Sequence, residues 1–336
     1  SEINKSYIQV AREELILFCP MTEAQKKTYL DLVRLSRRTG MLQNAMTLQL
    51  ITAMMQLTAH PQACENILQK FDIEPIPNSK TPETAAAEGP DCHNELLQSS
   101  KFAFTSLIIQ SAVAKGDRIV VVSNLSYSIA LLERWCAAQN FRTCRIDGKT
   151  ATSSRQDIVD NFNRGCYHVC LLSLRAGGVG LNLTGANHLC LLEVAWNPAL
   201  DAQATARIFR DGQAKDVHIY RLVCMGTIEE KVYQRQLAKE ALACGTLENI
   251  GEGSASKEVN LSKETIRELM WFRESETSCD TSDLISSKQV RHLRDVTEEL
   301  RHQFPFGEGY DKGFIKCVLQ DKSDLSAARR AEEQTN

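Results

Sequence analysis

The chain has 336 residues, of which 43% are hydrophobic and 24% are charged, and its formal net charge is −3 at pH 7. A chain of this length and composition can bury a large core and suggests about two globular units, which excludes disorder throughout. No run of about 18 apolar residues occurs and the first residues lack the pattern of a signal peptide, so we expect a soluble protein that is not secreted.

The first 100 residues predict a strand, two helices and a surface linker. Residues 10–19 are apolar enough for a strand, and Thr22 then caps a helix whose apolar positions have helical spacing. A second helix is predicted at 46–59. Four of the eight prolines lie within 75–90, so this segment is predicted to be a linker or an insertion on the surface.

From residue 101 onward the sequence alternates between strand and helix patterns. Short apolar strands that are regularly separated by helices are typical of a parallel sheet with helices on both faces. We therefore predict one RecA-like α/β lobe. Its predicted strands are 118–123, 141–147, 168–173, 188–193 and 217–223, and its predicted helices are 101–114, 127–139, 153–163, 199–208 and 227–242.

After Gly245 the sequence becomes polar and rich in Gly and Ser. It then predicts one short amphipathic helix, SKETIRELMWF, at 262–272. The remaining tail is charged and weakly patterned, which is typical of segments that are helical in patches or disordered.

The 12 cysteines are spread along the chain from Cys19 to Cys317. Cys166 and Cys170 form the closest pair, but no second pair stands at the spacing of zinc ligands. We therefore expect reduced, buried thiols and no bound metal, as in proteins of the cytosol or nucleus.

Ligands of parallel α/β sheets bind at the carboxyl ends of the strands, which places function in the loops after Ser123, Asp147, Ser173 and Glu193. The loop at 173–187, SLRAGGVGLNLTGAN, has three glycines in four residues. Glycines let backbone N–H groups approach a phosphate. A glycine-rich loop alone is more often a tight connection, and this one matches neither common nucleotide-binding pattern.

A second segment, DAQATARIFRDGQ at 201–213, predicts a helix that presents Gln203, Arg207 and Arg210 on one face. Arginine can bind phosphate oxygens in a bidentate manner and can stabilise the charge that develops during phosphoryl transfer. For two arginines alone, a solvated basic face that pairs with Asp201 or Asp211 would be the favoured interpretation. The combination with the glycine-rich loop in one lobe favours the phosphate interpretation.

In these segments the chain resembles the second motor lobe of the SWI/SNF-type, superfamily-two double-strand DNA translocases. The resemblance covers residues 101–242 and rests on SNLSYSIALLERW, RIDGKTATSSRQDIVDNFN, LLSLRAGGVGLNLTGAN, WNPALDAQATARIFRDGQ and VHIYRLVCMGTIEEKVYQRQ. The RDGQ, IYRL, GTIEEK and QRQ sequences are most similar to those of the homologous-recombination subgroup. The translocases of this subgroup work with the strand-exchange recombinase. The chain has AWNP at 195–198 where DWNP is usual, and Arg175 where Lys is common.

Upstream of the lobe, LILFCPMTEAQKKTYLDLV resembles the last first-lobe strand of the family, and LQLITAMMQLTAHP resembles its helical connector. The resemblance therefore implies that residues 1–22 hold the terminal strand of a first lobe or a linker. It further implies a helical connector with a Pro-rich insertion at 23–100, the second RecA-like lobe at 101–244 and a partly helical extension at 245–336.

The resemblance also implies roles for individual residues at the nucleotide. Arg207 and Arg210 would reach the ATP phosphates across the cleft to a first lobe, one of them as an arginine finger. Gln203 would help to set that interface, and the glycine-rich loop would contact the nucleotide through Gly178 and Gly180.

A second set of matching residues would hold one DNA strand by its phosphates: Ser123, Asn124, Gly148, Lys149, Thr150, Arg155, Ser173, Arg175, Gly177 and Trp196. Such backbone contacts carry no base information, so binding should tolerate any sequence and weaken with salt. Thr150 and Ser153 could equally cap the following helix, and Trp196 could equally pack in the core. Thr227 and Glu230 match a capping box and need no functional explanation.

No GxxxxGKT/S phosphate loop or DEAH box occurs in the 336 residues. ATP and Mg²⁺ would therefore be held mainly by a first lobe, and we expect the isolated chain to be inactive as an ATPase. The leading hypothesis is the second lobe of a nuclear, ATP-dependent double-strand DNA translocase that acts in homologous recombination and DNA repair or in chromatin remodelling. Its implied partners are double-stranded DNA, the first motor lobe, a RecA-type recombinase filament and nucleosomes, but no membrane.

The weakly basic centre of the chain, with 17 Lys or Arg and 12 Asp or Glu in residues 101–240, is compatible with a DNA partner. One alternative is a nucleosome-remodelling or transcription-coupled-repair motor of the same family. Another takes the isolated chain as a non-catalytic module that binds DNA or a partner. An RNA helicase is disfavoured, because Gly212 and Gln213 stand where its arginine segment usually ends in GRxxR.

Overall fold

A seven-stranded sheet with the order β3-β4-β2-β5-β6-β1-β7 lies at the centre of the molecule. The structure, a computed structural model, describes residues 10–38, 44–73, 92–174, 180–247, 269–270, 272, 281 and 317–321. The strands are β1 (Arg12–Cys19), β2 (Ile119–Ser123), β3 (Thr143–Ile146), β4 (Val169–Ser173), β5 (His188–Leu191), β6 (Val217–Cys224) and β7 (Cys317–Asp321). The first six are mutually parallel, and β7 runs antiparallel to β1.

The helices follow the order expected from the sequence. They are α1 (Glu23–Arg38), α2 (Asn44–Ala59), α3 (Glu65–Leu68), α4 (Cys92–Leu96), α5 (Ser100–Ala114), α6 (Ser126–Ala138), α7 (Thr152–Asn163), α8 (Pro198–Thr205) and α9 (Ile228–Leu247), with short 3₁₀ turns η1 (Pro61–Cys64) and η2 (Gln69–Phe71). None of the helices within the described ranges is long and apolar enough to cross a membrane.

Helices cover both faces of the sheet, which confirms the predicted fold class. In β2, Ile119 and Val121 point into a core that contains residues of α5 and α6. The alternate residues, Val120 and Val122, point into a second core that contains residues of α7 and α8. A strand with side chains buried on both faces must be apolar throughout, which explains why β2 reads IVVVS.

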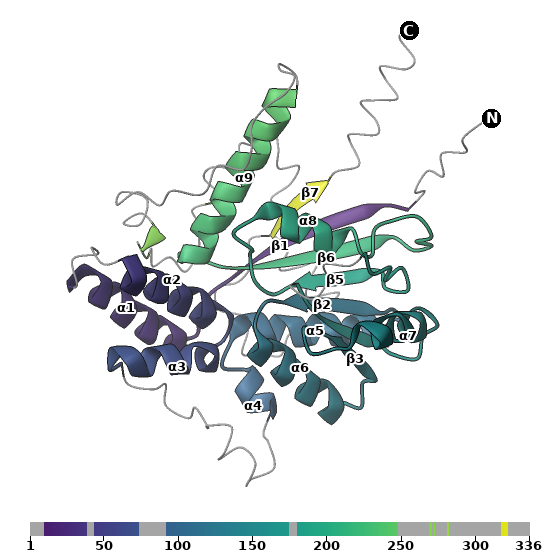
Figure 1. Cartoon of the computed structure of the whole chain (residues 1–336), viewed down its shortest axis with the longest axis horizontal. Helices are drawn as coiled ribbons and strands as arrows, with labels where there is room; N and C mark the ends of the chain where they lie inside the picture. Colours follow the sequence, from purple (N-terminus) through teal and green to yellow (C-terminus); the bar gives the residue numbers. More distant parts are fainter. Residues whose placement is uncertain are drawn as a thin grey trace.

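The expectation that the first strand belongs to another lobe is wrong for the residues of β1. All eight residues of β1 pair with β6, from Arg12 opposite Val217 to Cys19 opposite Cys224. β1 therefore lies inside this sheet, between β6 and β7 (Figure 1). The backbone groups of β1 form the hydrogen bonds that β6, as a buried strand, needs on this side.

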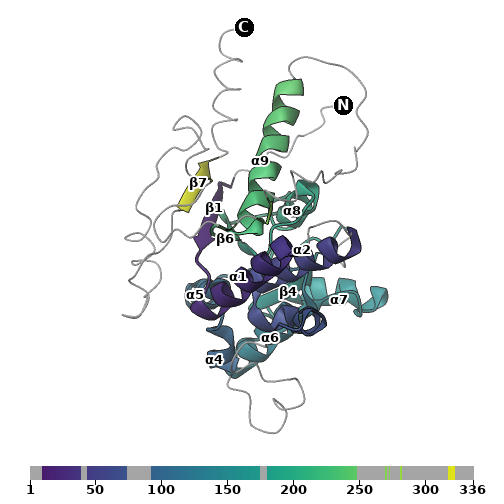
Figure 2. The same cartoon turned by 90° about the vertical axis from the view of Figure 1, so that its left-hand side faces the viewer.

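A third core joins the helical connector to the end of the lobe. It contains residues of α1, α2 and α9 together with Leu269 and Met270 of the C-terminal extension. Tyr29 of α1 accepts a hydrogen bond from the N–H of Ile228 at the start of α9 (2.8 Å), and its ring lies 5.4 Å from that of Phe272. Figures 1 and 2 show α9 projecting beyond the sheet from this contact.

Several sequence predictions fall outside the described residues. These are the Pro-rich insertion within 74–91, most of the helix predicted at 262–272, and most of the C-terminal tail. The structure describes the side chains of nine cysteines; these nine are free thiols, and eight of them are buried. The buried thiols agree with the expectation that cysteines serve here as small apolar residues.

Candidate functional site

The carboxyl ends of the parallel strands bring several of the predicted site residues to one edge of the sheet. Ser123 at the end of β2 is the direct neighbour of Ser173 at the end of β4. Glu193 follows β5, which pairs with β2 on its other side. The loop after β3 lies at the same edge, beyond β4. The topology thus places four loop segments along one edge, as the sequence pattern predicts.

At the end of β2, the polar groups predicted to hold DNA are turned toward the protein interior. The Ser123 hydroxyl donates a hydrogen bond to Glu193 Oε1 (2.8 Å), and the Asn124 N–H donates to Glu193 Oε2 (2.9 Å). Ser123 is only 2% exposed. Its hydroxyl therefore does not face solvent, where a DNA phosphate would bind. Glu193, which accepts the hydrogen bond from Ser123, was not among the residues predicted from the sequence to bind DNA.

Glu193 itself is buried, and burial raises its pKa to about 7. The hydrogen bonds from Asn124 and Ser123 act in the opposite direction, since they stabilise the charged carboxylate, as does the positive charge of Lys101. A carboxyl group with this pKa changes charge near neutral pH.

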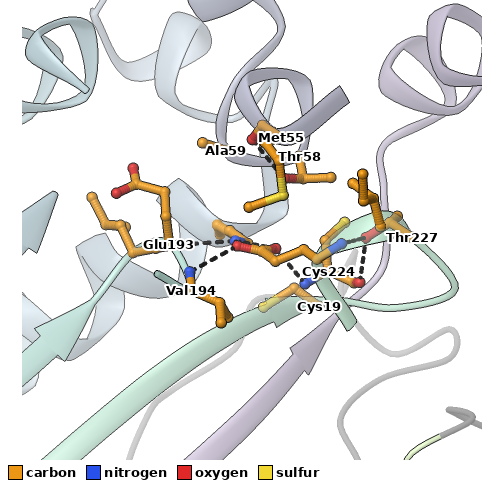
Figure 3. A network of polar contacts seen from close by, with 12 residues as sticks. Cys19, Met55, Thr58, Ala59, Glu193, Val194, Cys224 and Thr227 are labelled. Carbon is orange, nitrogen blue, oxygen red and sulfur yellow. Dashed lines mark hydrogen bonds and ion pairs between the residues drawn. The ribbon is translucent and has the colours of Figure 1, made fainter. Parts of the chain in front are cut away.

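Next to Glu193 lies a fully buried ion pair between Lys101 of α5 and Glu229 of α9, with 2.5 Å between Nζ and Oε2. Lys101 Nζ also donates to the carbonyl oxygen of Leu192 (2.8 Å). Glu229 accepts hydrogen bonds from the N–H groups of Val194 (3.2 Å) and Cys224 (2.9 Å). Figure 3 shows this network, with Val194 and Cys224 labelled. It anchors the segment after β5 to the neighbouring strand and to two helices.

The loop after β3 presents Gly148 and Lys149 to solvent. Asp147 holds the turn, because its Oδ1 accepts hydrogen bonds from the Lys149 N–H (2.9 Å) and the Thr150 hydroxyl (3.3 Å). Burial raises the pKa of Asp147. The hydrogen bond from the Lys149 N–H and the neighbouring Arg145 lower this pKa by more, so the net shift is downward. The turn is therefore held by a charged carboxylate.

Thr150 and Arg155 both support this turn. The N–H of Asp147 donates to Thr150 Oγ1 (3.0 Å), and α7 has no side-chain cap at its N-cap residue, Ala151. The helix-capping alternative for Thr150 is therefore wrong. Arg155 donates from Nε to the carbonyl oxygen of Thr150 (3.2 Å). The side chain of Lys149 is thus exposed to solvent, whereas that of Arg155 stabilises the backbone of the loop through a hydrogen bond.

The glycine-rich loop is described only in part. Arg175, Gly177 and Gly178 lie outside the described residues. Gly180 is described, and a Cβ added to it would lie 3.8 Å from an Nη atom of Arg207. The structure therefore brings the end of the glycine-rich loop beside the predicted arginine finger.

The arginine segment differs from its prediction as a single helical face. Helix α8 ends at Thr205, so only Gln203 lies on it, where it is exposed. Arg207 and Arg210 follow in turns; Arg207 is 6% exposed and Arg210 is exposed. The pKa of Arg207 is lowered by burial and by the positive charge of Arg210. The two guanidinium groups are thus close enough to repel each other, although they do not share a helical face.

Gln213 stabilises the end of this segment. Its Nε2 donates to the carbonyl oxygens of Ile208 (3.0 Å) and Ala186 (2.7 Å). The N–H of Leu183 donates to the carbonyl oxygen of Arg207 (3.0 Å). The carbonyl groups of Arg207 and Ile208 thus have partners outside a helix. The chain can therefore leave the helix after Thr205 without leaving these groups unpaired, although its sequence keeps helical spacing.

A buried charged cluster joins α8 to the sheet. Arg221 of β6 binds Glu14 of β1 (2.9 Å) and Asp201 of α8 (2.5 Å), and Asp201 also accepts from Gln236 of α9 (3.2 Å). The alternative in which Asp201 pairs with the arginines of its own segment is therefore excluded. The signal for this cluster is a charged residue inside an apolar strand, as in REELILFC and VHIYRLVC.

Trp196 is 40% exposed in the loop before α8, so the core-packing alternative for it is wrong. Thr227 and Glu230 both accept backbone hydrogen bonds at the start of α9, but neither has the partner that the predicted capping box requires. Thr227 Oγ1 accepts from the Glu229 N–H (3.2 Å), whereas Glu230 accepts from the N–H of Gly226 (2.7 Å). Within the described ranges, no group of three or more His, Cys, Asp or Glu side chains could hold a metal ion.

Comparisons with known proteins agree on one family. The helicase conserved C-terminal domain family matches residues 100–212. The chain is 36% identical to the DNA repair and recombination protein RAD54B of Gallus gallus over 293 residues, which is 82% of this chain and 31% of that protein. It is 32% identical to the DNA repair and recombination protein RAD54 of Saccharomyces cerevisiae over 283 residues, with the same two coverages. The chain thus spans about a third of the length of these curated relatives.

Two solved structures share the fold. The C-terminal part of the Fun30 ATPase domain has a TM-score of 0.55 at 23% identity, covering 67% of this chain and 89% of that one. The Sulfolobus solfataricus SWI2/SNF2 ATPase core in complex with dsDNA has a TM-score of 0.53 at 24% identity, covering 71% of this chain and 46% of that one. Together with the sequence relatives, these likenesses identify the lobe. The chain contains a helicase C-terminal lobe of the RAD54 type, with a RecA-like fold.

Proposed function

We propose that this chain is the C-terminal motor lobe of an ATP-dependent double-strand DNA translocase that acts in DNA repair and homologous recombination in the nucleus. The names of its relatives support the pathway, since they are DNA repair and recombination proteins. The observation that carries the motor function is the position of Arg207, which lies buried beside Gly180 with the charge of Arg210 nearby.

Two like charges held together are the arrangement that an anion stabilises. Burial and mutual repulsion both disfavour the charged form of Arg207, and the negative charge of an ATP phosphate would relieve both. The residues present thus fit a polyphosphate. ATP, when bound, would supply a terminal phosphoryl group, and Arg207 and Arg210 would stabilise the negative charge on it. We assign Mg²⁺ and the remaining nucleotide contacts to a first lobe, because the chain has no phosphate-loop sequence.

The DNA contact is proposed at the strand-end edge. Gly148 and Lys149 are exposed there on a turn held by Asp147, and Trp196 is exposed beside α8. A lysine suits phosphate oxygens and does not read bases there. The double-stranded DNA in the Sulfolobus solfataricus structure supports duplex DNA as the partner. A recombinase filament and nucleosomes are further proposed partners of the whole protein.

The test joins this chain to the first lobe of a RAD54-type protein and measures DNA-stimulated ATP hydrolysis. Arg207→Ala and Arg210→Ala should each lower kcat by at least about 100-fold. The matched control is Arg164→Ala, an exposed arginine at the end of α7. DNA affinity and the melting temperature should change little. Equal losses of hydrolysis, affinity and stability would contradict a role at the phosphate.

The same protein tests the non-catalytic alternative. If the joined protein binds DNA but hydrolyses no ATP, the chain is a binding module rather than a motor lobe. If hydrolysis depends on nucleosomes instead of free duplex, the nucleosome-remodelling alternative is favoured over repair.

A further inference from the structure

Glu193 uses both of its carboxylate oxygens to hold the loop that follows β2. Oε1 accepts from the Ser123 hydroxyl (2.8 Å) and Oε2 from the Asn124 N–H (2.9 Å). The Ser123 oxygen in turn accepts from the Leu125 N–H (3.0 Å). Three consecutive residues at the predicted DNA-binding edge therefore take their conformation from one side chain that arrives from a different strand.

The cation nearest to Glu193 does not form an ion pair with it, so the carboxylate is held mainly by the loop after β2. Lys101 of α5 is the nearby cation, but its Nζ donates to Glu229 of α9 and to the Leu192 carbonyl oxygen. The Ser128 hydroxyl of α6 also donates a hydrogen bond to Oε1, at the longer distance of 3.4 Å. The negative charge of Glu229 adds to the effect of burial in raising the pKa of Glu193. Another titratable neighbour is the Cys190 thiol of β5, whose pKa is raised to about 12 by burial.

We propose that Glu193 is a positioning residue for DNA binding: its charged carboxylate sets the backbone of residues 123–125, and loss of that charge weakens the grip on duplex DNA. The inference rests on the proposed function, since it assumes that this edge contacts DNA. In a protonated or amide side chain, one of the two groups becomes a donor, and only one oxygen can still accept from the Asn124 N–H. The Ser123 hydroxyl would then have to turn and accept, and both contacts would lose the carboxylate charge, which makes such hydrogen bonds roughly twice as strong as neutral ones.

The opposite relationship would be competition, in which Glu193 occupies the place of a DNA phosphate and must leave before DNA binds. The burial of the contact favours positioning instead. Ser123 is 2% exposed and Glu193 is 8% exposed, so a phosphate could reach these donors only if the end of β2 came apart. Competition predicts tighter DNA binding after removal of the charge, and positioning predicts weaker binding.

The pH dependence has a distinctive sign. Because burial raises the pKa of Glu193 to about 7, the carboxylate is charged above neutral pH and gains a proton as the pH falls below it. Positioning predicts that DNA affinity then decreases. Acidification normally strengthens DNA binding, since it adds positive charge to a protein. Lys101, whose pKa is raised by the charge of Glu229 against the effect of burial, and the Cys190 thiol keep their protonation in this range.

The experiment measures duplex-DNA affinity of the 336-residue chain by fluorescence anisotropy at constant ionic strength. It compares the wild type with Glu193→Gln between about pH 6 and about pH 8.5. At the upper pH the variant should bind about tenfold more weakly, and the two affinities should converge at the lower pH. Glu23→Gln, at an exposed glutamate of α1, is the control and should match the wild type throughout. Ser123→Ala should weaken binding in the same direction as Glu193→Gln.

A ratio of affinities that does not change with pH, or tighter binding by Glu193→Gln, would overturn the inference. A second measurement uses only the wild type and so does not depend on the folding of a variant. The amide resonance of Asn124 should titrate with a midpoint near pH 7, and its failure to do so would also overturn the inference. If neither the wild type nor any variant binds DNA at any pH, the proposed function fails instead, while the amide titration still reports on the contact.

Discussion

Lys101 and Glu229 form a salt bridge whose two side chains are both completely buried, with 2.5 Å between Nζ and Oε2. The pair connects the first helix of the lobe to the helix that follows its last parallel strand. Burial alone would lower the pKa of Lys101, but the charge of Glu229 raises it above its ordinary value. Each charge is therefore tolerated in the core only because the other is present.

Lys101→Met should lower the free energy of unfolding by about 3–5 kcal/mol, because it leaves Glu229 buried without a counter-charge. The double variant Lys101→Met with Glu229→Gln should recover part of this loss, since the amide carries no charge and can still accept a backbone hydrogen bond. Urea unfolding of the three proteins tests both statements. The control is Lys115→Met at the exposed end of the same helix. If Lys101→Met unfolds like the control, the buried pair does not contribute as described.

The stability of the chain should depend on pH through Glu193. Its pKa rises from 4.5 to about 7 on folding, so between these values the folded state holds a proton that the unfolded state has released. This contribution to stability is present at low pH and is lost as the pH rises toward 7. Relative to the wild type, Glu193→Gln should therefore gain up to about 3 kcal/mol between about pH 5 and about pH 8. A difference in unfolding free energy that is independent of pH would show that Glu193 has an ordinary pKa.

The salt dependence of DNA binding should report on Lys149. Replacing this exposed lysine with alanine removes one phosphate contact, so the slope of log affinity against log salt should become shallower by about one. The loss should be the same for unrelated duplex sequences. Lys115→Ala lies before β2, at the opposite edge of the sheet, and should leave the slope unchanged. A sequence-dependent loss would contradict a backbone contact.

Two glycines should respond differently to the same substitution. A Cβ on Gly185 would lie 2.7 Å from the Cα of Asn163, so Gly185→Ala must displace backbone and should cost about 1–3 kcal/mol of stability. A Cβ on Gly148 would meet nothing within 4 Å, so Gly148→Ala should fold normally. Thermal unfolding of both variants tests the difference. Equal melting temperatures would mean that the contact at Gly185 relaxes at no cost.

The parts of the fold that depend on local pattern could be predicted from the sequence. The strand IVVVS and the helices around it are recognisable because a doubly covered strand must be apolar throughout. The assignment of β1 failed because its partner β6 lies about 200 residues later, and no local pattern records that pairing. The end of α8 was missed for a similar reason, since the residues after it have hydrogen-bonding partners outside a helix: Gln213 donates to the Ile208 carbonyl oxygen and the Leu183 N–H donates to that of Arg207.

The candidate site shows the same division. Residue types suited to phosphate could be recognised at the strand ends, but the direction in which each polar group points could not. Ser123 turns inward because Glu193 comes beside it from β5, and Thr150 closes a turn because Asp147 accepts its hydrogen bond. Each orientation depends on a partner that the topology supplies. The exposure of Trp196 likewise follows from where its loop lies rather than from its residue type.

The position of β1 between β6 and β7 affects how the lobe folds during synthesis and where it can be truncated. The ribosome delivers β1 about 200 residues before its neighbour β6, so β1 has no partner on that side until most of the lobe has been synthesised. The domain match at 100–212 omits β1 and stops before β6. A fragment trimmed to that match, or one that starts at α5 and keeps β6, would leave an inner strand with open backbone groups. Such an edge invites pairing with other chains, so soluble fragments should start before Arg12.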